Sequence, residues 1–217
     1  MTEPILEHRS AGSRNHGVSA QLREQTSEHH QRAERSEFQQ RFVRGKLPVS
    51  AYVAWLEQML CVYQVLESQL SSGASTAAGL DVEPWRRTEH LTRDLTYLRA
   101  ADPVLPVNAT RAFLQQLGHW AQSQPLALLG VLYVLEGSTN GSRFIAKSLR
   151  KAYNLGDAGG LAFMDPYGAS QPERWRTFKA ELDRAIPAAA AAGLIDTAKK
   201  TFDAVSAIGE ELLPLKG

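Results

Sequence analysis

Cysteine, long apolar runs and excess charge are all scarce in this chain of 217 residues. The single cysteine, Cys61, cannot form a disulfide within the chain, and apolar neighbours surround it, so we expect a packed thiol in a reducing compartment. No apolar run approaches the roughly 20 residues that span a bilayer. The N-terminus also lacks the basic-then-apolar order of a signal peptide. We therefore expect a cytoplasmic protein that does not bind membranes.

The charge is nearly balanced, with 24 basic and 23 acidic side chains and a formal net charge of +1. This balance argues against a broad nucleic-acid or anionic-membrane surface. A GxGxxG turn after a strand is missing too, so we expect no resident flavin or nicotinamide. Residues 1–18 are polar and have no hydrophobic period, which predicts a mobile N-terminal tail before one domain, 19–217.

Hydrophobic residues recur at steps of three and four along most of this domain, which predicts amphipathic helices. The clearest example begins at Pro48 and has one apolar face, formed by Tyr52, Leu56, Met59, Leu60, Tyr63, Leu66 and Leu70. The glycine- and proline-rich stretch 155–172 should be irregular. Alternating β-type runs and internal repeats are lacking, so the fold class is all-α, a single compact helical bundle. Further helices are expected at 85–98, 110–122, 125–154, 173–185 and 194–213.

The segment "EGSTNG" interrupts the helical pattern in the middle of 125–154. Gly137 and Gly141 each cost about 1 kcal/mol relative to alanine in a helix interior, and Ser, Thr and Asn are poor helix formers as well. Two glycines four residues apart leave one helical face without side chains, so a flat partner can lie against the backbone. A close helix crossing, or a loop that divides two helices, explains the same spacing and is commoner.

A histidine pair occurs in "LREQTSEHHQRAERSEF", residues 22–38. Adjacent helical positions point about 100° apart, so His29 and His30 cannot both face one pocket, and at most one is buried. Glu34 follows His30 by one turn, where its carboxylate can accept the second imidazole N–H and strengthen the ring as a metal ligand. A solvated histidine beside a glutamate is the more common explanation.

Together the two segments resemble the heme oxygenase family. "LREQTSEHHQRAERSEF" and the following "FVRGKLPVSAYVAWLEQMLCVYQVLE" are similar to its proximal helix and the helix after it, and "LYVLEGSTNGSRF" is similar to the distal helix of its bacterial, biliverdin-producing branch. "FMDPYG", "WRTFKAEL" and "AKKTFDAVSAIGEELL" match later segments. The resemblance covers about residues 20–213. It implies that heme lies between a proximal and a distal helix.

The resemblance also implies roles for particular residues. His30 is the expected iron ligand, with Glu34 as its hydrogen-bonding partner. Gly137, Ser138 and Gly141 are the expected catalytic residues of the distal helix, where the glycines leave room for O₂. The remaining heme-binding residues are Arg23, Tyr133 and Lys179, expected near the propionates, and Phe202, an expected aromatic wall of the pocket.

The implied activity is oxidative cleavage of heme, which is both cofactor and substrate, to biliverdin, CO and ferrous iron. O₂ and an external electron donor, such as ferredoxin, flavodoxin or a reductase, are the implied partners. Three positions depart from the pattern of the family. Gly137 stands where animal members carry an aspartate, so water would be held by backbone groups, Ser138 or Asn140. Asn140 replaces a bulky apolar residue, and His29 replaces a small or apolar one.

Three alternatives remain open. A heme carrier or sensor on the same fold would share every ligand, and a distal group that grips O₂ too firmly would favour it. A di-iron oxidase or a thiamin-degrading relative would lack heme, but a di-iron site wants several Glu and His at helical spacing, and only His30 with Glu34 fits. Glu89 and His90 are adjacent in the chain, so they lack the helical spacing that a di-iron site needs. A helical interaction module would leave the glycines unexplained.

Overall fold

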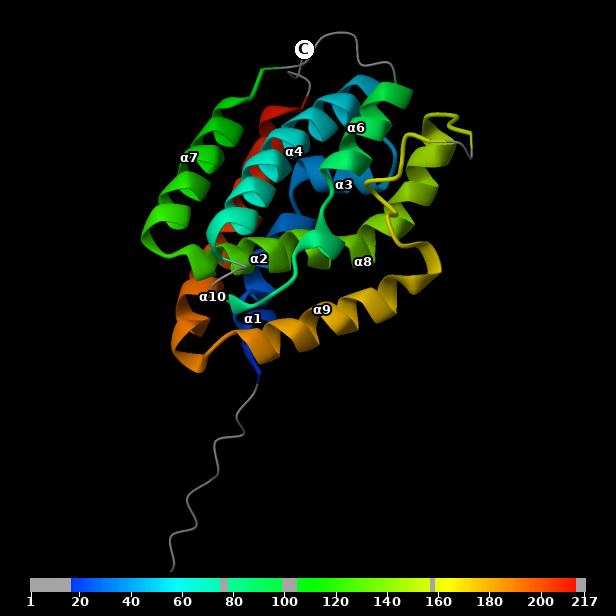
Figure 1. Ribbon diagram of the computed structural model, residues 1–217. Coiled ribbons are helices and arrows are strands. Elements are labelled where there is room, and N and C mark those ends of the chain that lie inside the picture. The colour runs from blue at the N-terminus through cyan, green and yellow to red at the C-terminus, as the bar shows by residue number, and fades with distance from the viewer. Residues whose placement is uncertain (1–16, 75–77, 99–104, 157–158, 214–217) are drawn as a thin grey trace, which may run out of the picture.

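The computed structural model describes residues 17–74, 78–98, 105–156 and 159–213. Within these ranges the chain forms helices and no strand, which confirms the predicted all-α class. The long helices pack into the bundle drawn in Figure 1. Short 3-10 or π-helical turns occur beside several of them. The helices are α1 (Val18–Gln25), α2 (Ser27–Glu34), α3 (Glu37–Val43), α4 (Val49–Gln69), α6 (Thr88–Tyr97), α7 (Asn108–Ser123), α8 (Leu128–Ala152), α9 (Gln171–Ala185) and α10 (Ala191–Glu211).

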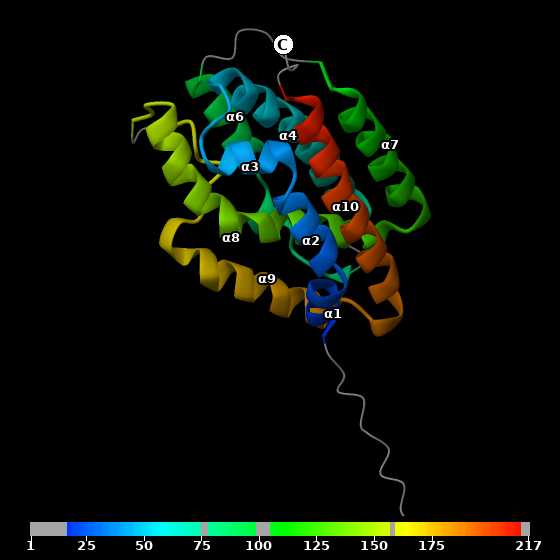
Figure 2. The same ribbon diagram turned by 180° about the vertical axis from the view of Figure 1, so that it is seen from behind.

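The core lies where α4, α7, α8 and α10 meet. The apolar face predicted after Pro48 is confirmed, because six of its seven side chains are almost fully buried, and Leu60 packs against the same core. Helix α10 packs on α8, α7 and also on α1 and α2, so it joins the N-terminal helices to the centre of the bundle (Figure 2). None of the helices in the described ranges is long and apolar enough to cross a membrane.

The N-terminal segment is broken where the sequence indicated one helix. Helix α1 ends at Gln25. The hydroxyl of the next residue, Thr26, donates to the carbonyl of Leu22 at 2.7 Å. Such bonding by a threonine competes with the regular helical bond and bends the chain. A second break precedes α3, where the hydroxyl of Ser36 caps the helix by accepting from the N–H of Gln39. The predicted tail falls almost wholly on residues 1–16, outside the described residues, whereas buried Val18 belongs to α1.

Helix α8 is continuous through the glycine-containing segment, so no loop divides 125–154. The polar side chains there donate to backbone carbonyls three residues earlier: Ser138 to Leu135, Thr139 to Glu136, and Asn140 to Gly137. These bonds offset the poor helix propensity of the segment and favour a bend. Figures 1 and 2 both show that α8 changes direction along its length.

A polar clamp joins the first helix to α9. Asp183 accepts hydrogen bonds from the backbone N–H of Ser19 at 2.7 Å and from its hydroxyl at 2.8 Å. Gly17 precedes α1 at a point where a Cβ would lie 2.6 Å from the Asp183 carboxyl carbon. The close approach of the two helices therefore depends on glycine at this position. Both pictures place α1 beside the end of α9.

Candidate functional site

His30 lies on α2 with its side chain 56% exposed. Its Nδ1 is 3.7 Å from the Glu34 carboxylate, the partner predicted one turn later. Its ring also meets the Phe202 ring of α10 edge-on, with 5.5 Å between the centroids and 86° between the planes. In the described part of the chain, Nε2 has no hydrogen-bond partner. The imidazole is thus oriented by two neighbours and keeps one nitrogen available for a ligand.

His29 is directed to a different partner. Its Nδ1 is 3.2 Å from the Asp203 carboxylate on α10, and the Arg32 guanidinium contacts both groups, at 2.7 Å from His29 and 2.9 Å from Asp203. Neither histidine is fully buried, in keeping with the expectation that at most one would be. Because His29 is held in this charged cluster, the two adjacent imidazoles do not compete for one position.

Gly137 and Gly141 of α8 have different surroundings. A Cβ on Gly141 would meet nothing within 4 Å, so this glycine faces open space. A Cβ on Gly137 would lie 3.2 Å from an atom of the Trp175 indole on α9. Trp175 therefore occupies the space beside Gly137. The backbone of α8 at Gly141 is instead open to a flat ligand.

Ser138 and Asn140 use their hydrogens within α8. The Ser138 hydroxyl donates to Leu135 at 2.7 Å and the Asn140 amide donates to Gly137 at 2.9 Å. The lone pairs of the Ser138 hydroxyl and the amide oxygen of Asn140 remain acceptors. Both side chains can thus accept hydrogen bonds from water; the single donor of Ser138 is engaged with the helix, whereas Asn140 keeps a second amide N–H.

Tyr133, Lys179 and Trp175 gather at the edge of this region. The rings of Tyr133 and Trp175 have centroids 5.2 Å apart, and the Lys179 ammonium lies 5.6 Å from the indole centroid. Burial raises the pKa of Tyr133, while the charge of Arg23 on α1 acts weakly in the opposite direction. The phenol of Tyr133 is therefore a neutral donor, with the guanidinium of Arg23 close enough to influence it. Three residues predicted separately as propionate partners thus lie in one neighbourhood.

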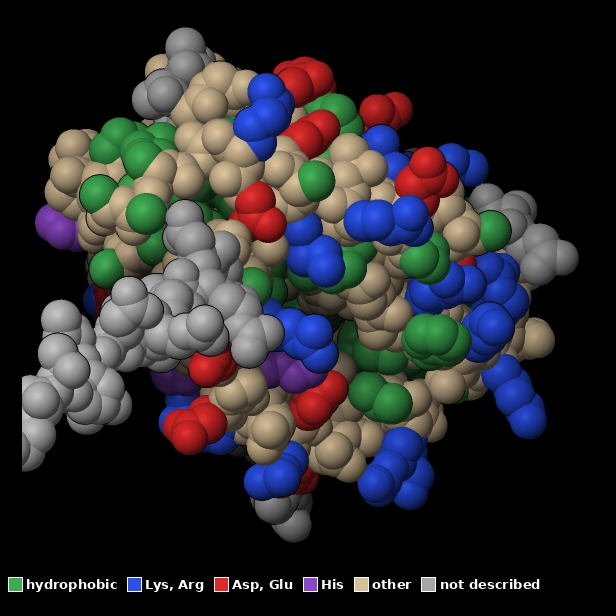
Figure 3. Space-filling model, turned by 90° about the horizontal axis from the view of Figure 1, so that it is seen from below, with side chains coloured by type: hydrophobic (Ala, Val, Ile, Leu, Met, Phe, Trp, Pro, Cys, Tyr) green, Lys and Arg blue, Asp and Glu red, His purple; other side chains and the backbone are tan. Residues whose placement is uncertain are grey.

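Figure 3 shows the molecule from below, on the face that carries part of this region. A hollow lies near the middle of the view, with hydrophobic side chains inside it. Basic side chains and some acidic ones stand around the hollow, and histidine is visible at its edge. An apolar recess with basic groups at its rim suits a ligand that has a flat apolar body and anionic ends.

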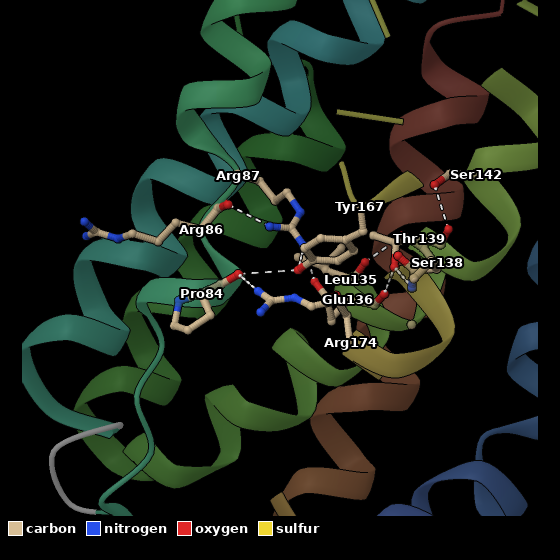
Figure 4. Close-up of polar contacts among 12 residues, drawn as sticks. Pro84, Arg86, Arg87, Leu135, Glu136, Ser138, Thr139, Ser142, Tyr167 and Arg174 are labelled. Carbon is tan, nitrogen blue, oxygen red and sulfur yellow. Dashed lines mark hydrogen bonds and ion pairs between the residues drawn. The ribbon is translucent and has the colours of Figure 1, made fainter. Parts of the chain in front are cut away.

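A buried ion pair anchors Glu136 of α8 (Figure 4). Arg87 donates to the Glu136 carboxylate at 2.6 Å, and both side chains are 1% exposed. Arg87 also donates to the Tyr167 hydroxyl, and its guanidinium lies 4.5 Å from the Tyr167 ring centroid. Burial raises the pKa of Glu136 to about 7, although Arg87 opposes that shift. The cluster joins the distal helix to the segment before α6 and to the loop before α9.

Sequence reasoning singled out neither this cluster nor Trp175. The signal for Glu136 was an acidic residue at the end of an apolar run, which marks a buried charge that needs a partner. Its partners Arg87 and Tyr167 lie 49 and 31 positions away in the chain, so sequence spacing could not identify them. Cys61 on α4, which was expected to be a packed thiol, is only partly buried, and this burial raises the pKa of its thiol.

No group of three or more His, Cys, Asp or Glu side chains that could hold a metal ion occurs among residues 17–74, 78–98, 105–156 and 159–213. A di-iron centre needs such a group. A single histidine with one open nitrogen instead suits a metal whose other ligands come from a macrocycle.

Comparison with known proteins identifies the family. A sequence model described as heme oxygenase matches residues 16–211. The heme oxygenase of Xanthomonas campestris pv. campestris is 30% identical over 149 residues, which are 68% of this chain and 81% of that protein. The heme oxygenase of Guillardia theta is 26% identical over 157 residues, or 68% of this chain. The chain spans 65% of the length of the latter relative.

Solved structures show the same fold. The heme oxygenase of Leptospira interrogans superposes with a TM-score of 0.81 at 24% identity, covering 90% of this chain and 100% of that one. The heme oxygenase-1 of Synechocystis sp. PCC6803 in complex with heme also gives 0.81, at 22% identity, covering 91% and 92%.

Proposed function

Because the chain belongs to the heme oxygenase family, we propose that it binds heme and opens the ring oxidatively to biliverdin, CO and ferrous iron. An external donor such as ferredoxin, flavodoxin or a reductase would deliver the electrons. Bound heme would supply the iron that activates O₂ and the carbon that is attacked. The protein itself would supply orientation, access and hydrogen bonds.

The residues present fit a flat metal macrocycle. His30 keeps Nε2 available while Glu34 and Phe202 orient its ring, and Gly141 leaves the backbone of α8 open to a ligand. Helices α2 and α8 both pack on α10, so one helix supports the two sides, and Phe202 stands on that helix. The pairing of this half-exposed histidine with the open backbone at Gly141 is the observation that carries the proposal.

Each side chain then has a task. His30 would bind the iron as a neutral imidazole, and Glu34 would accept a hydrogen bond from its Nδ1–H. Arg23, Tyr133 and Lys179 would bind the propionates through charge-assisted hydrogen bonds. Ser138 and Asn140 would each accept one hydrogen bond from a water on the distal side, which would hold that water in place and leave its second O–H available to donate. Gly137 would act with Trp175 as a wall.

A heme carrier or sensor is the rival function on this fold. A sensor would favour a distal donor that holds O₂ firmly. Asn140 keeps one of its two amide hydrogens, whereas the only hydroxyl hydrogen of Ser138 is bonded to the carbonyl of Leu135 and is not directed to a ligand. This arrangement supports turnover over storage.

The test is an absorption titration of the purified protein with hemin, followed by ascorbate or a reductase under air with catalase present. We expect a Soret band that saturates at one heme per chain and then disappears as a biliverdin band grows. A stable ferrous-oxy spectrum would identify a carrier, and an unshifted Soret band would exclude heme binding.

A further inference from the structure

Trp175 stands on α9 where that helix meets α8. Its indole edge lies against the Cα of Gly137, and its ring packs on Tyr133, four residues earlier on the same face of α8. A tryptophan that contacts both positions covers one full turn of the distal helix. It therefore borders the region where Gly141 leaves the backbone open.

The indole is held rigidly. It stacks on the Phe178 ring with 5.6 Å between centroids and only 15° between planes. Phe178 is fully buried and meets the Trp85 ring at 5.1 Å, so this stack is anchored in the core. A large ring fixed by a buried neighbour makes a firm support for the groups beside it.

Two of these groups are the proposed propionate partners. Tyr133 reaches the indole from α8, and Lys179 reaches it from the next turn of α9, with its ammonium 5.6 Å from the ring centroid. The negative face of an indole attracts such a cation and restricts a flexible side chain. One residue thus locates two anion-binding groups that belong to different helices.

We propose that Trp175 is a positioning residue that sets how the macrocycle is rotated within its own plane, by holding Tyr133 and Lys179 at fixed places. This inference rests on the proposed function. Propionates bind where those two groups lie, and the rotation of the ring decides which bridging carbon faces the distal helix. Trp175 therefore determines which biliverdin isomer forms, although it donates nothing to the reaction.

The experiment compares Trp175→Ala and Trp175→Phe with the wild-type protein, each loaded with hemin. The first readout is the pattern of hyperfine-shifted heme methyl resonances in the ferric cyanide complex, which reports the rotation of the ring without turnover. The second is the isomer composition of the biliverdin. Trp55→Phe is the matched control, because Trp55 is also partly buried but packs on Phe38 and Phe42 of α3.

We expect Trp175→Ala to show a second set of methyl resonances and a mixture of isomers, with hemin affinity weakened by about two- to fivefold. Trp175→Phe should retain the wild-type pattern in large part, since a flat ring remains. Trp175→Leu repeats the test while keeping apolar bulk, in case the alanine variant does not fold. A Lys179→Met change combined with Trp175→Ala should give less than the sum of the two separate losses of affinity.

A folded Trp175→Ala or Trp175→Leu protein with the wild-type resonance pattern and a single, unchanged isomer would overturn the inference alone. Failure of the wild-type protein to bind hemin would instead remove the proposed function and this role with it. The two failures are distinct, because the first requires a normal Soret band in the wild-type protein.

Discussion

The Phe202 ring approaches the His30 ring edge-on, with their planes at 86°. Phe202 stands on α10 and His30 on α2, 172 positions apart in the chain. Glu34 contacts Nδ1 of the same imidazole, so its orientation is set by one neighbour from its own helix and one from the C-terminal helix. The available Nε2 is therefore a product of tertiary packing and of local spacing together.

His30→Ala should abolish the specific iron ligation of hemin and stop turnover, because the adjacent imidazole of His29 is directed to Asp203 and Arg32. The Soret spectrum of the complex and the yield of biliverdin measure both effects, and added imidazole should restore part of the spectrum. His29→Ala is the control, since His29 is engaged with Asp203 and Arg32. Normal ligation and product yield in the His30 variant would contradict the assignment.

Gly141→Ala should raise the free energy of unfolding of the heme-free protein by about 0.5–1 kcal/mol, because alanine is the better helix former and the new methyl meets nothing within 4 Å. Gly137→Ala should gain less or nothing, since its methyl would lie 3.2 Å from Trp175. Urea denaturation of both variants measures the difference. Equal gains at the two positions would show that Trp175 does not constrain Gly137.

Glu136→Gln should remove part of the pH dependence of stability. The pKa of Glu136 rises from 4.5 to about 7 on folding, so the folded state holds its proton more tightly than the unfolded chain. The stabilisation that Glu136 contributes to the folded state is fully present below pH 4.5 and is lost as the pH rises through about 7. This shift corresponds to on the order of 3 kcal/mol.

The measurement is the free energy of unfolding of wild type and Glu136→Gln, compared at intervals between pH 4.5 and 7.5 by urea titration. The wild-type value should fall more steeply with rising pH than that of the variant. Parallel curves for the two proteins would mean that Arg87 holds the Glu136 carboxylate ionised throughout this range.

Asp183→Ala should loosen α1 from α9, because the carboxylate accepts two hydrogen bonds from Ser19. Losing them should cost about 1–2 kcal/mol of stability, and amide hydrogen exchange within α1 should accelerate. Asp196→Ala is the matched control, because the Asp196 pair with Lys200 is about half exposed and should contribute at most about 1 kcal/mol. Unchanged hydrogen exchange in α1 after Asp183→Ala would show that the hydrogen bonds between Ser19 and Asp183 do not hold α1 on α9.

The sequence by itself determined the all-α class, the main helices and most candidate residues. Helical periodicity is a local property, since side chains three and four positions apart meet on one face whatever the rest of the chain does. The His30 and Glu34 pair follows from that spacing. The motif resemblance placed the chain in its family, because the order and spacing of several segments are specific together.

Only the tertiary structure decided how these residues are used. It kept α8 continuous through Gly137 and Gly141, because polar side chains donate back to the helix. It filled the space at Gly137 with Trp175 and left Gly141 open. It also paired Glu136 with Arg87. Contacts of this kind join residues far apart in the chain, and their geometry depends on how whole helices pack, which no local pattern specifies.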